Sequence, residues 1–177
     1  MEKNKTKIIA GTGIFTALSF LVSFLEFPIF PATSFLQIDF SAVFTLLSGF
    51  VFGPVSAIIV SLIKELLRFL INPGSSGGIG ELANFIITLS YVLLPTVLYR
   101  KIKGIKVVII TLVISSVFAS GVALLTNKFI LFPLYGFSQF FASVWWYVLL
   151  FNLIKYFAVS LLTFIIYKRV SIFIKKI

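Results

Sequence analysis

The chain has 177 residues, of which 60% are hydrophobic and only 11% charged, and its mean hydropathy is +1.16. A soluble domain of this length keeps a large share of its residues in water and cannot hide that much apolar surface. Lipid must therefore be the solvent for most of the chain. The sequence has no cysteine and no histidine, which excludes disulfides, thiolate chemistry and imidazole metal ligands.

The net charge of +10 raises the question of nucleic-acid binding, since basic patches bind phosphate backbones. The positions of the basic residues argue against nucleic acid as a partner. They gather at the N-terminus, between residues 100 and 106, and in the C-terminal tail. Retention of positive residues on the cytoplasmic side of membrane loops produces this distribution. We therefore expect a multi-pass protein of the cytoplasmic membrane with both termini inside.

Apolar runs separated by turn signals predict one all-α membrane-embedded domain over residues 1–177, with six transmembrane helices. The first connection contains Pro28 and Pro31 and no basic residue, which predicts a partly ordered external loop or a re-entrant hairpin. The pair Gly53-Pro54 marks a turn. The glycine-rich segment 74–80 lacks the Gly-Lys-Ser/Thr ending of a phosphate-binding loop, so we expect an external linker or gate. The predicted spans are 8–25, 40–52, 55–71, 81–99, 107–125 and 142–167.

Three ionisable residues fall within one turn of the third predicted span: Lys64, Glu65 and Arg68. Charged side chains at the centre of a span cost about 2.5–3.5 kcal/mol on insertion scales, so they are functional candidates by default. Glu65 and Arg68 are three residues apart and can pair on one helix face. Alternatively, Arg68 extends its head group to the outer surface and the other charges pair internally. We keep Lys64 as a candidate for substrate binding.

Asn152 and Lys155 are also three residues apart, within a strongly apolar run. An amide beside an ammonium offers hydrogen-bond donors and an acceptor to a planar polar ligand. Hydrogen bonding between helices is the alternative role. The absence of an acidic residue near Lys155 in the sequence favours the ligand role. Glu81 and Asn84 open the fourth span as further candidates, although Glu81 also suits a helix N-terminus for electrostatic reasons.

The first helix carries small residues on one side, at Ala10, Gly13 and Ala17. Such a stripe lets another helix approach closely, either within the chain or in a partner subunit. Aromatic residues near the predicted external loops supply apolar walls for a flat ring, since small-molecule sites combine apolar walls with a few convergent polar groups. These aromatic candidates are Phe27, Phe30, Phe35, Phe40, Phe85 and Tyr135.

Several segments resemble the S-components of energy-coupling-factor (ECF) vitamin transporters. They are residues 35–41 (FLQIDFS), 46–54 (LLSGFVFGP) and 62–64 (LIK), and the run 80–85 (GELANF) is similar to the riboflavin-specific members. The resemblance extends over nearly the whole chain. It implies six helices, an externally open pocket for riboflavin as transported ligand, and no catalysis or cofactor. It also implies two cytoplasmic ATPase subunits that act through a transmembrane coupling subunit in contact with the first helix.

By the same resemblance, Asn127, Asn152 and Lys155 hydrogen-bond the pyrimidine-like edge of the isoalloxazine ring. That edge alternates carbonyl oxygens with an N–H, an amide can pair with both kinds, and an ammonium can donate to a carbonyl. Asp39 either accepts a hydrogen bond from a ribityl hydroxyl or orders the first loop, and the sequence favours neither.

Three other functions were weighed against this one. The chain can be an S-component for another vitamin. A small ion-gradient-driven transporter typically needs an intramembrane relay and often an inverted repeat; we find no convincing repeat, although Glu65 and Glu81 are possible relay groups. A membrane-embedded enzyme has little to draw on, because the sequence lacks His, Cys and clustered acidic residues.

Overall fold

The structure is a computed structural model that describes residues 2–71, 77–102 and 104–174. The all-α prediction is confirmed: the described chain consists of long helices with one very small hairpin. The helices are α1 (Glu2–Ser23), α2 (Ser41–Phe52), α3 (Pro54–Ile71), α4 (Ile79–Lys101), α5 (Ile105–Thr126), α6 (Phe132–Leu134) and α7 (Phe141–Ile174), and the strands are β1 (Phe27–Pro28) and β2 (Gln37–Ile38). Single turns of other helix types lie at Pro31–Thr33, Asn127–Leu131 and Ser138–Phe140.

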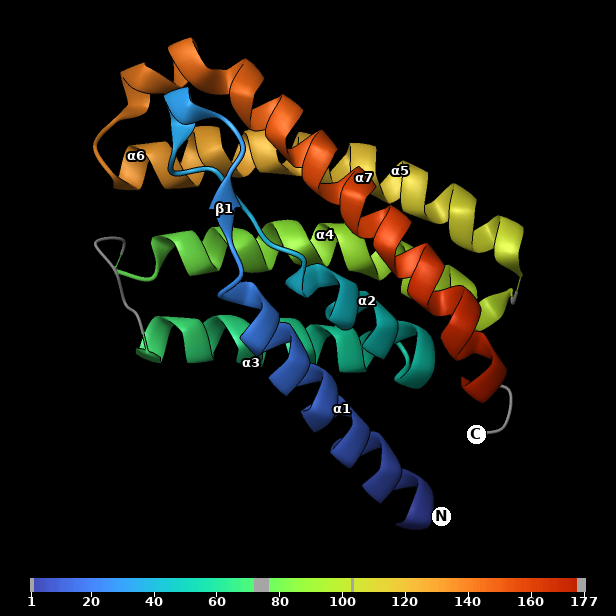
Figure 1. The fold of residues 1–177 in the computed structure, drawn as a ribbon. Helices are drawn as coiled ribbons and strands as arrows, with labels where there is room; N and C mark the ends of the chain where they lie inside the picture. Colours follow the sequence, from blue (N-terminus) through green and yellow to red (C-terminus); the bar gives the residue numbers. More distant parts are fainter. Residues whose placement is uncertain (1, 72–76, 103, 175–177) are drawn as a thin grey trace.

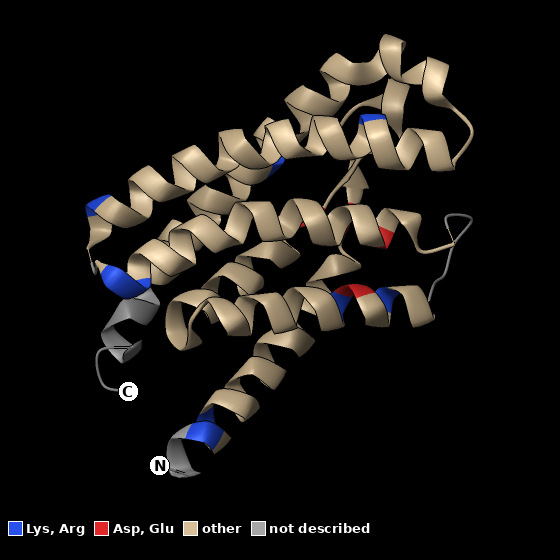
Figure 2. Ribbon diagram, turned by 180° about the vertical axis from the view of Figure 1, so that it is seen from behind, with Lys and Arg blue, Asp and Glu red and all other residues tan. Residues whose placement is uncertain are grey.

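The helices form a bundle in which α3, α4 and α5 lie side by side, α1 crosses α3, and α7 crosses α5 (Figure 1). The two chain termini lie at the end of the bundle where α4 turns into α5, and we call this the basic end. The opposite end carries the β1–β2 hairpin and the connections from α3 to α4 and from α5 to α7, and we call it the loop end. Lys and Arg residues mark the basic end, and further ones lie on the helices toward the loop end, where the red Asp and Glu residues also lie (Figure 2).

Four helical stretches of the described chain are long and apolar enough to cross a membrane: Lys5–Ser23, Ile79–Lys101, Ile105–Leu134 and Ser138–Tyr167. The two remaining long helices differ in kind. Helix α2 has 12 residues, which is about 18 Å of helix against a hydrocarbon core of about 30 Å. Helix α3 has 18 residues but contains Lys64, Glu65 and Arg68. Other helices surround most of α2. Helix α3 buries one face, which includes Lys64 and Glu65, and leaves apolar side chains such as Leu66 and Leu70 exposed on the outside of the bundle.

The short helix α2 lies at the centre of the bundle, with most of its residues buried. It ends at Gly53, whose φ of +99° suits glycine because other residues rarely adopt it. Gly49 allows α4 to come close: a Cβ atom at this position would lie 2.2 Å from Cγ2 of Thr96. The predicted turn at residues 53–54 is therefore present and joins α2 directly to α3.

Hydroxyl groups join the helices inside the bundle. Ser19 and Thr45 connect α1 with α2 through an oxygen–oxygen distance of 3.2 Å, and Tyr91 connects α4 with α7 through Ser160 at 2.7 Å. Such polar contacts, together with close packing, hold membrane helices together, because lipid provides no hydrophobic driving force between them. The bundle thus forms a packed frame for the loop end.

The predicted loop between the first two helices is ordered as an antiparallel hairpin, with Phe27 paired to Ile38 and Pro28 to Gln37. Its apolar side chains pack on α7: Leu36 and Ile38 form a buried cluster with Val148 and Phe151. The hairpin therefore lies across the loop end of the bundle. Residues 74–76 of the predicted glycine-rich segment 74–80 fall outside the described residues, and its last two residues, Ile79 and Gly80, begin α4.

Candidate functional site

A cavity of about 240 Å³ lies at the loop end, lined by five parts of the chain. The α1–α2 loop contributes one wall, α4, the end of α5 and the middle of α7 contribute the others, and Arg68 reaches the edge from α3. Polar groups from all five parts converge on it. Its lining residues are Glu26, Phe35, Leu36, Gln37, Asp39, Arg68, Gly80, Glu81, Ala83, Asn84, Ile87, Asn127, Leu131, Tyr135, Phe151, Asn152, Lys155 and Tyr156.

The cavity brings together most of the residues that the sequence singled out for ligand binding. Asp39, Glu81, Asn84, Asn127, Tyr135, Asn152 and Lys155 all line it. The aromatic candidate Phe35 lines it as well. Five candidates lie elsewhere: Phe27 and Phe30 in the α1–α2 loop, Phe85 at a second cavity, Phe40 and Lys64. Phe40 packs between the two apolar clusters of the core, and Lys64 is buried behind the cavity wall beside Glu65 and Ser41. The role of every one of these residues toward a ligand stays a prediction.

Helical periodicity places the α7 residues of the cavity on one face. Asn152 and Lys155 are three residues apart, and Tyr156 follows Asn152 by four, so all three project to the same side. The ring of Tyr156 lies 4.5 Å from that of Tyr91, which forms a tilted aromatic pair between α7 and α4. The polar pair therefore projects from a helix face that is fixed by aromatic packing.

Asn127 opens a π-helical turn, Asn127–Leu131, at the end of α5. In this turn the backbone N–H of Phe132 donates to the carbonyl of Asn127, five residues earlier. Pro133 follows directly, and a proline ring clashes with the carbonyl four residues before it, which disfavours a regular α-helix at this point. The wide turn adds a residue and turns the end of α5 toward the cavity, as such turns often do at functional sites.

The two asparagine side chains have the same local arrangement. Each amide nitrogen donates to the backbone carbonyl four residues earlier, Asn127 to Ala123 and Asn152 to Val148, both at 2.8 Å. A carbonyl can only accept, so these bonds fix the orientation of the amide. The amide oxygen and one N–H of each side chain remain for another partner. Two hydrogen-bond acceptors are thus held at fixed positions beside the Lys155 ammonium.

Asp39 is buried, with 6% of its surface exposed, in the loop just before α2. One carboxylate oxygen accepts hydrogen bonds from the backbone N–H of Ser41, at 2.9 Å, and from the Ser41 hydroxyl. The other accepts from Nζ of Lys155 at 2.7 Å. Burial alone raises the pKa of this carboxyl, but the charges of Lys155 and Lys64 outweigh burial and hold its pKa below the ordinary range. Asp39 is therefore a carboxylate that ties the α1–α2 loop to α7.

The structure decides the ion pairs that the sequence left open. Lys155 has an acidic partner, because folding brings Asp39 to it from 116 positions away in the sequence. Of the two alternatives for the third helix, pairing of Glu65 with Arg68 does not occur, whereas internal pairing does, between Lys64 and Glu65 at 2.5 Å. Arg68 instead binds Glu26 through two hydrogen bonds of 2.9 Å. These partners lie far apart in the sequence, so the spacing of residues within one helix could not reveal them.

Several residues that line the cavity were not among the ligand-binding candidates chosen from the sequence. Gly80 and Ile87 lie four and three residues from Asn84 on one helix face, and Ala83 lies three and four residues from Gly80 and Ile87, so the place of this face was implicit once Asn84 was chosen. Glu26 and Arg68 are different, because they reach the cavity from a loop and from α3. Only the folded chain brings those two together at the cavity edge.

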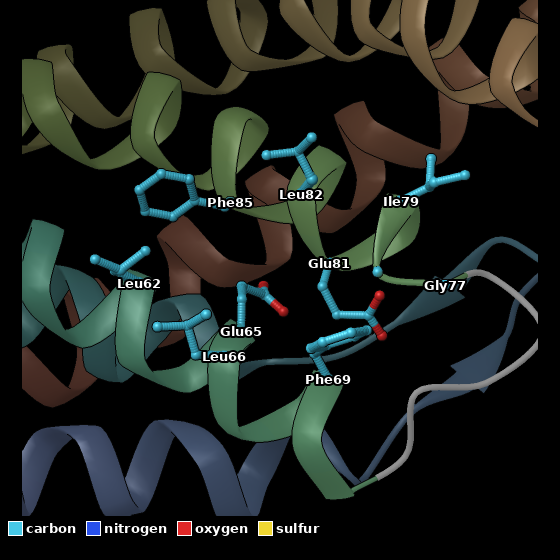
Figure 3. A pocket seen from close by; sticks show the side chains of 10 residues that line it. Leu62, Glu65, Leu66, Phe69, Gly77, Ile79, Glu81, Leu82 and Phe85 are labelled. Atoms are coloured by element: carbon cyan, nitrogen blue, oxygen red, sulfur yellow. The ribbon is translucent and has the colours of Figure 1, made fainter.

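A second cavity, of about 360 Å³, lies between α3 and the start of α4 (Figure 3). Its walls are mostly apolar, and Leu62, Leu66 and Leu82 are partly exposed on the outside of the bundle. Glu65 and Glu81 both project into the space between the two helices (Figure 3). Polar groups that converge from several elements distinguish a site for a polar ligand, and the first cavity has more of them.

The small residues of the first helix face away from the bundle. Ala10, Gly13 and Ala17 are all exposed, and a Cβ atom at position 13 would have nothing within 4 Å. Intramolecular packing, the simpler reading of this stripe, therefore does not use these three residues. A flat small-residue surface is left on α1, beside exposed side chains such as Ile9 and Ile14.

Comparison with known proteins assigns the family. The model of the ECF transporter substrate-specific component matches residues 7–167. The riboflavin transporter RibU of Staphylococcus aureus (strain TCH60) is 33% identical over 185 residues, with 100% of this chain and 96% of the relative covered. The riboflavin transporter FmnP of Bacillus subtilis (strain 168) is 27% identical over 133 residues, with 74% and 70% covered.

A solved structure agrees with this assignment. It is described as the S component of a bacterial ECF transporter, shares 32% sequence identity, and superimposes with a TM-score of 0.86 over 97% of this chain and 99% of that chain. The relatives are named as transporters, which confirms the expected non-enzymatic role. The chain belongs to the family of substrate-specific S components of ECF transporters.

Proposed function

We propose that this chain is the membrane subunit that binds riboflavin for uptake, with the loop-end cavity as its binding site. The observation that carries the proposal is the convergence of Asn127, Asn152 and Lys155 on one cavity. Relatives that match the chain over most of its length are named riboflavin transporters, and this supports riboflavin over another vitamin.

The hydrogen-bonding capacity of these three residues is complementary to the pyrimidine-like edge of a flavin. The amide oxygens of Asn127 and Asn152 can accept from the ring N–H, because each amide has one N–H engaged with its own helix. Lys155 has three donors and uses one on Asp39, so two remain for ring carbonyls. Phe151, Leu36 and Ile87 supply apolar wall for the ring. Glu81 and Asn84 then face the ribityl hydroxyls.

Riboflavin fluorescence tests this proposal directly. The purified protein is expected to be yellow, or to quench riboflavin fluorescence with a saturable, submicromolar dissociation constant. Lumiflavin, which has the same isoalloxazine ring with a methyl group in place of the ribityl chain, separates ring recognition from recognition of the hydroxyls. A colourless protein that leaves riboflavin fluorescence unchanged would remove the riboflavin assignment, and thiamine and biotin would then be screened.

The proposal includes an orientation with both termini in the cytoplasm and the loop end outside. The gathering of Lys and Arg at the basic end supports it (Figure 2), because the cytoplasmic side retains basic residues. The absence of native cysteine allows a clean test with single cysteine reporters. A membrane-impermeant maleimide should label Lys128→Cys in intact cells, and Lys106→Cys only after permeabilisation. The reverse pattern would invert the topology.

Energy for uptake comes, in this proposal, from two cytoplasmic ATPase subunits through a transmembrane coupling subunit. The exposed stripe of Ala10, Gly13 and Ala17 on α1 is the proposed contact with that subunit, since small residues let helices approach closely. Replacement of Ala17 by Trp should abolish riboflavin uptake in cells and leave riboflavin binding intact. Val117→Trp, on the exposed face of α5 and away from α1, is the matched control.

A further inference from the structure

Lys64 does not line the ligand cavity, but an unbroken chain of contacts connects it with the residues that do. Its Nζ lies 3.3 Å from the hydroxyl oxygen of Ser41. That hydroxyl and the backbone N–H of Ser41 both donate to Asp39, and Asp39 accepts from Lys155 at 2.7 Å. Asp39 and Lys155 are cavity residues. A buried cation on α3 is thus linked through α2 and the loop to α7.

The direction of every hydrogen bond in this chain is fixed by chemistry. An ammonium has donors only, so the hydroxyl oxygen of Ser41 accepts from Lys64. The single hydrogen of that hydroxyl is then directed to Asp39, whose charged carboxylate has acceptors only. With one oxygen of Asp39 occupied by Ser41, the other oxygen is left for Lys155. Lys64 therefore occupies the acceptor side of the Ser41 hydroxyl. Ser41 in turn occupies one oxygen of Asp39, and Lys155 binds the other oxygen.

Glu65 balances the charge of Lys64 but takes part in the network differently. The Lys64 ammonium lies 2.5 Å from one oxygen of Glu65, yet this contact lacks hydrogen-bond geometry. Among the described residues, neither oxygen of Glu65 has a hydrogen-bond partner. The directed bond of Lys64 goes to Ser41 instead. Lys64, Glu65, Asp39 and Lys155 together form a buried array with two positive and two negative charges.

We propose that Lys64 is a positioning residue for the ligand cavity, which holds Asp39 through Ser41 and thereby leaves Lys155 free to donate to the ligand. Two cations, Lys64 and Lys155, interact with the negative charge of Asp39. When Lys64 is absent, Lys155 is the only ammonium left beside that carboxylate, and its donors are drawn toward Asp39 and away from the cavity. The affinity readout of this inference rests on the proposed binding of riboflavin.

Two variants separate a positioning role from simple charge balance. Lys64→Met leaves Glu65 without its counter-charge, whereas Lys64→Met combined with Glu65→Gln keeps the array neutral. We expect the dissociation constant for riboflavin to rise about tenfold in both, as for loss of a hydrogen bond to a charged group. Lys128→Met, an exposed cation outside the network, should change it less than about twofold. Recovery of wild-type affinity in the neutral double variant would overturn the proposal.

A second test uses the same affinity measurements and asks whether Lys64 and Asp39 act on ligand binding together. If Lys64 acts through Asp39, the loss in Asp39→Asn combined with Lys64→Met is smaller than the product of the two single losses. Multiplicative losses would mean that the two residues act independently, and this result too would overturn the proposal.

A third readout needs no ligand, so it stands even if riboflavin does not bind. Protonated carboxyl groups absorb in the infrared, and a spectrum of Asp39→Asn identifies the band that belongs to Asp39. A pH titration of this band in the purified protein reports the pH at which Asp39 takes up a proton. In the neutral double variant this midpoint should lie about one unit higher than in Glu65→Gln alone, because the two variants differ only in the Lys64 cation. Glu65 is absent from both variants, and Arg68 and Lys155 are unchanged. An unchanged midpoint would show that Lys64 does not act on Asp39.

Discussion

The loop end and the basic end of the bundle are held together by different kinds of contact. At the loop end, ion pairs connect the α1–α2 loop with the helices: Glu26 with Arg68, and Asp39 with Lys155. At the basic end, helices are held to one another by close backbone approach, as at Gly49, and by paired hydroxyl groups, as between Tyr99 and Tyr167. The difference shows that the basic end is a closely packed, mostly apolar frame, whereas the loop end is held together by charged side chains.

The charged end also depends more on single partners. Removal of one partner of a buried ion pair leaves an uncompensated charge, whereas a shortened apolar contact leaves at most a small void. The proposed ligand-binding residues therefore lie at the end of the bundle where we expect substitutions to be least tolerated. The predictions below run from the largest expected effect to the smallest.

Asp39→Asn should have the largest effect. It removes the negative charge and turns an amide nitrogen toward the Lys155 ammonium, so two donors face each other. We expect a loss of about 3–5 kcal/mol in the free energy of unfolding, as for other broken buried pairs. Thermal unfolding in detergent measures it. Glu26→Gln is the matched control, because its pair with Arg68 is more exposed (28% and 17%) and an exposed pair contributes about 0–1 kcal/mol.

Gly49→Ala tests the frame at the basic end. The added methyl group meets Thr96 at 2.2 Å and Ala57 at 3.1 Å, so α2 and α4 must separate. Overpacking of this kind costs about 1–3 kcal/mol, again read from thermal unfolding. Gly13→Ala adds the same methyl group to an exposed helix face with open space around it. An equal loss in both variants would mean that the close approach of α2 and α4 contributes nothing.

Asn152→Ala should weaken riboflavin binding about tenfold, roughly the worth of a hydrogen bond in a desolvated site. Arg68→Ala should weaken it less, because Arg68 is engaged with Glu26 and the Ser23 carbonyl at the cavity edge. Fluorescence titration of both variants measures the ratio. Equal losses, accompanied by equal losses in stability, would indicate general damage and contradict the assignment of the site.

Tyr99→Phe removes one hydroxyl from the basic end. The two tyrosine oxygens lie 2.6 Å apart, and the rings of Tyr99 and Tyr167 both pack against Phe50. Since the aromatic packing remains, we expect a loss of about 0.5–1.5 kcal/mol, the net worth of one hydrogen bond. Riboflavin affinity should be unchanged, and a change in affinity would contradict the separation of frame and site.

The pH dependence of stability should show no contribution from Asp39 between pH 8 and pH 5. Its pKa is held below the ordinary range in the folded protein, so its stabilising effect is complete above the unfolded pKa of about 3.9. That effect is lost only as the pH falls below this value. The difference in melting temperature between the wild type and Asp39→Asn should therefore be constant from pH 8 to pH 5. A difference that already shrinks at pH 6 would contradict an ionised, paired Asp39.

Part of the site was visible in the sequence because helical periodicity acts over short distances. Asn152 and Lys155 were recognised as one face of a helix, and Glu81 and Asn84 as the opening of another, from spacings of three residues alone. The resemblance to S-components of ECF transporters added Asn127, which the spacing of its own helix did not single out. Lys64 was recognised as exceptional, although its place behind the cavity was not.

The sequence by itself determined the membrane environment, the all-α class and the main polar candidates, since composition and local periodicity act within a few turns of helix. Only the tertiary structure decided which charges meet. Lys155 pairs with Asp39 over a separation of 116 residues and Arg68 with Glu26 over 42. Of the two alternatives that the sequence left open for Glu65, it pairs with Lys64 and not with Arg68. The physical reason is that a buried charge needs a counter-charge nearby in space, and the packing of the loop and helices, not the order of residues along the chain, brings the two together.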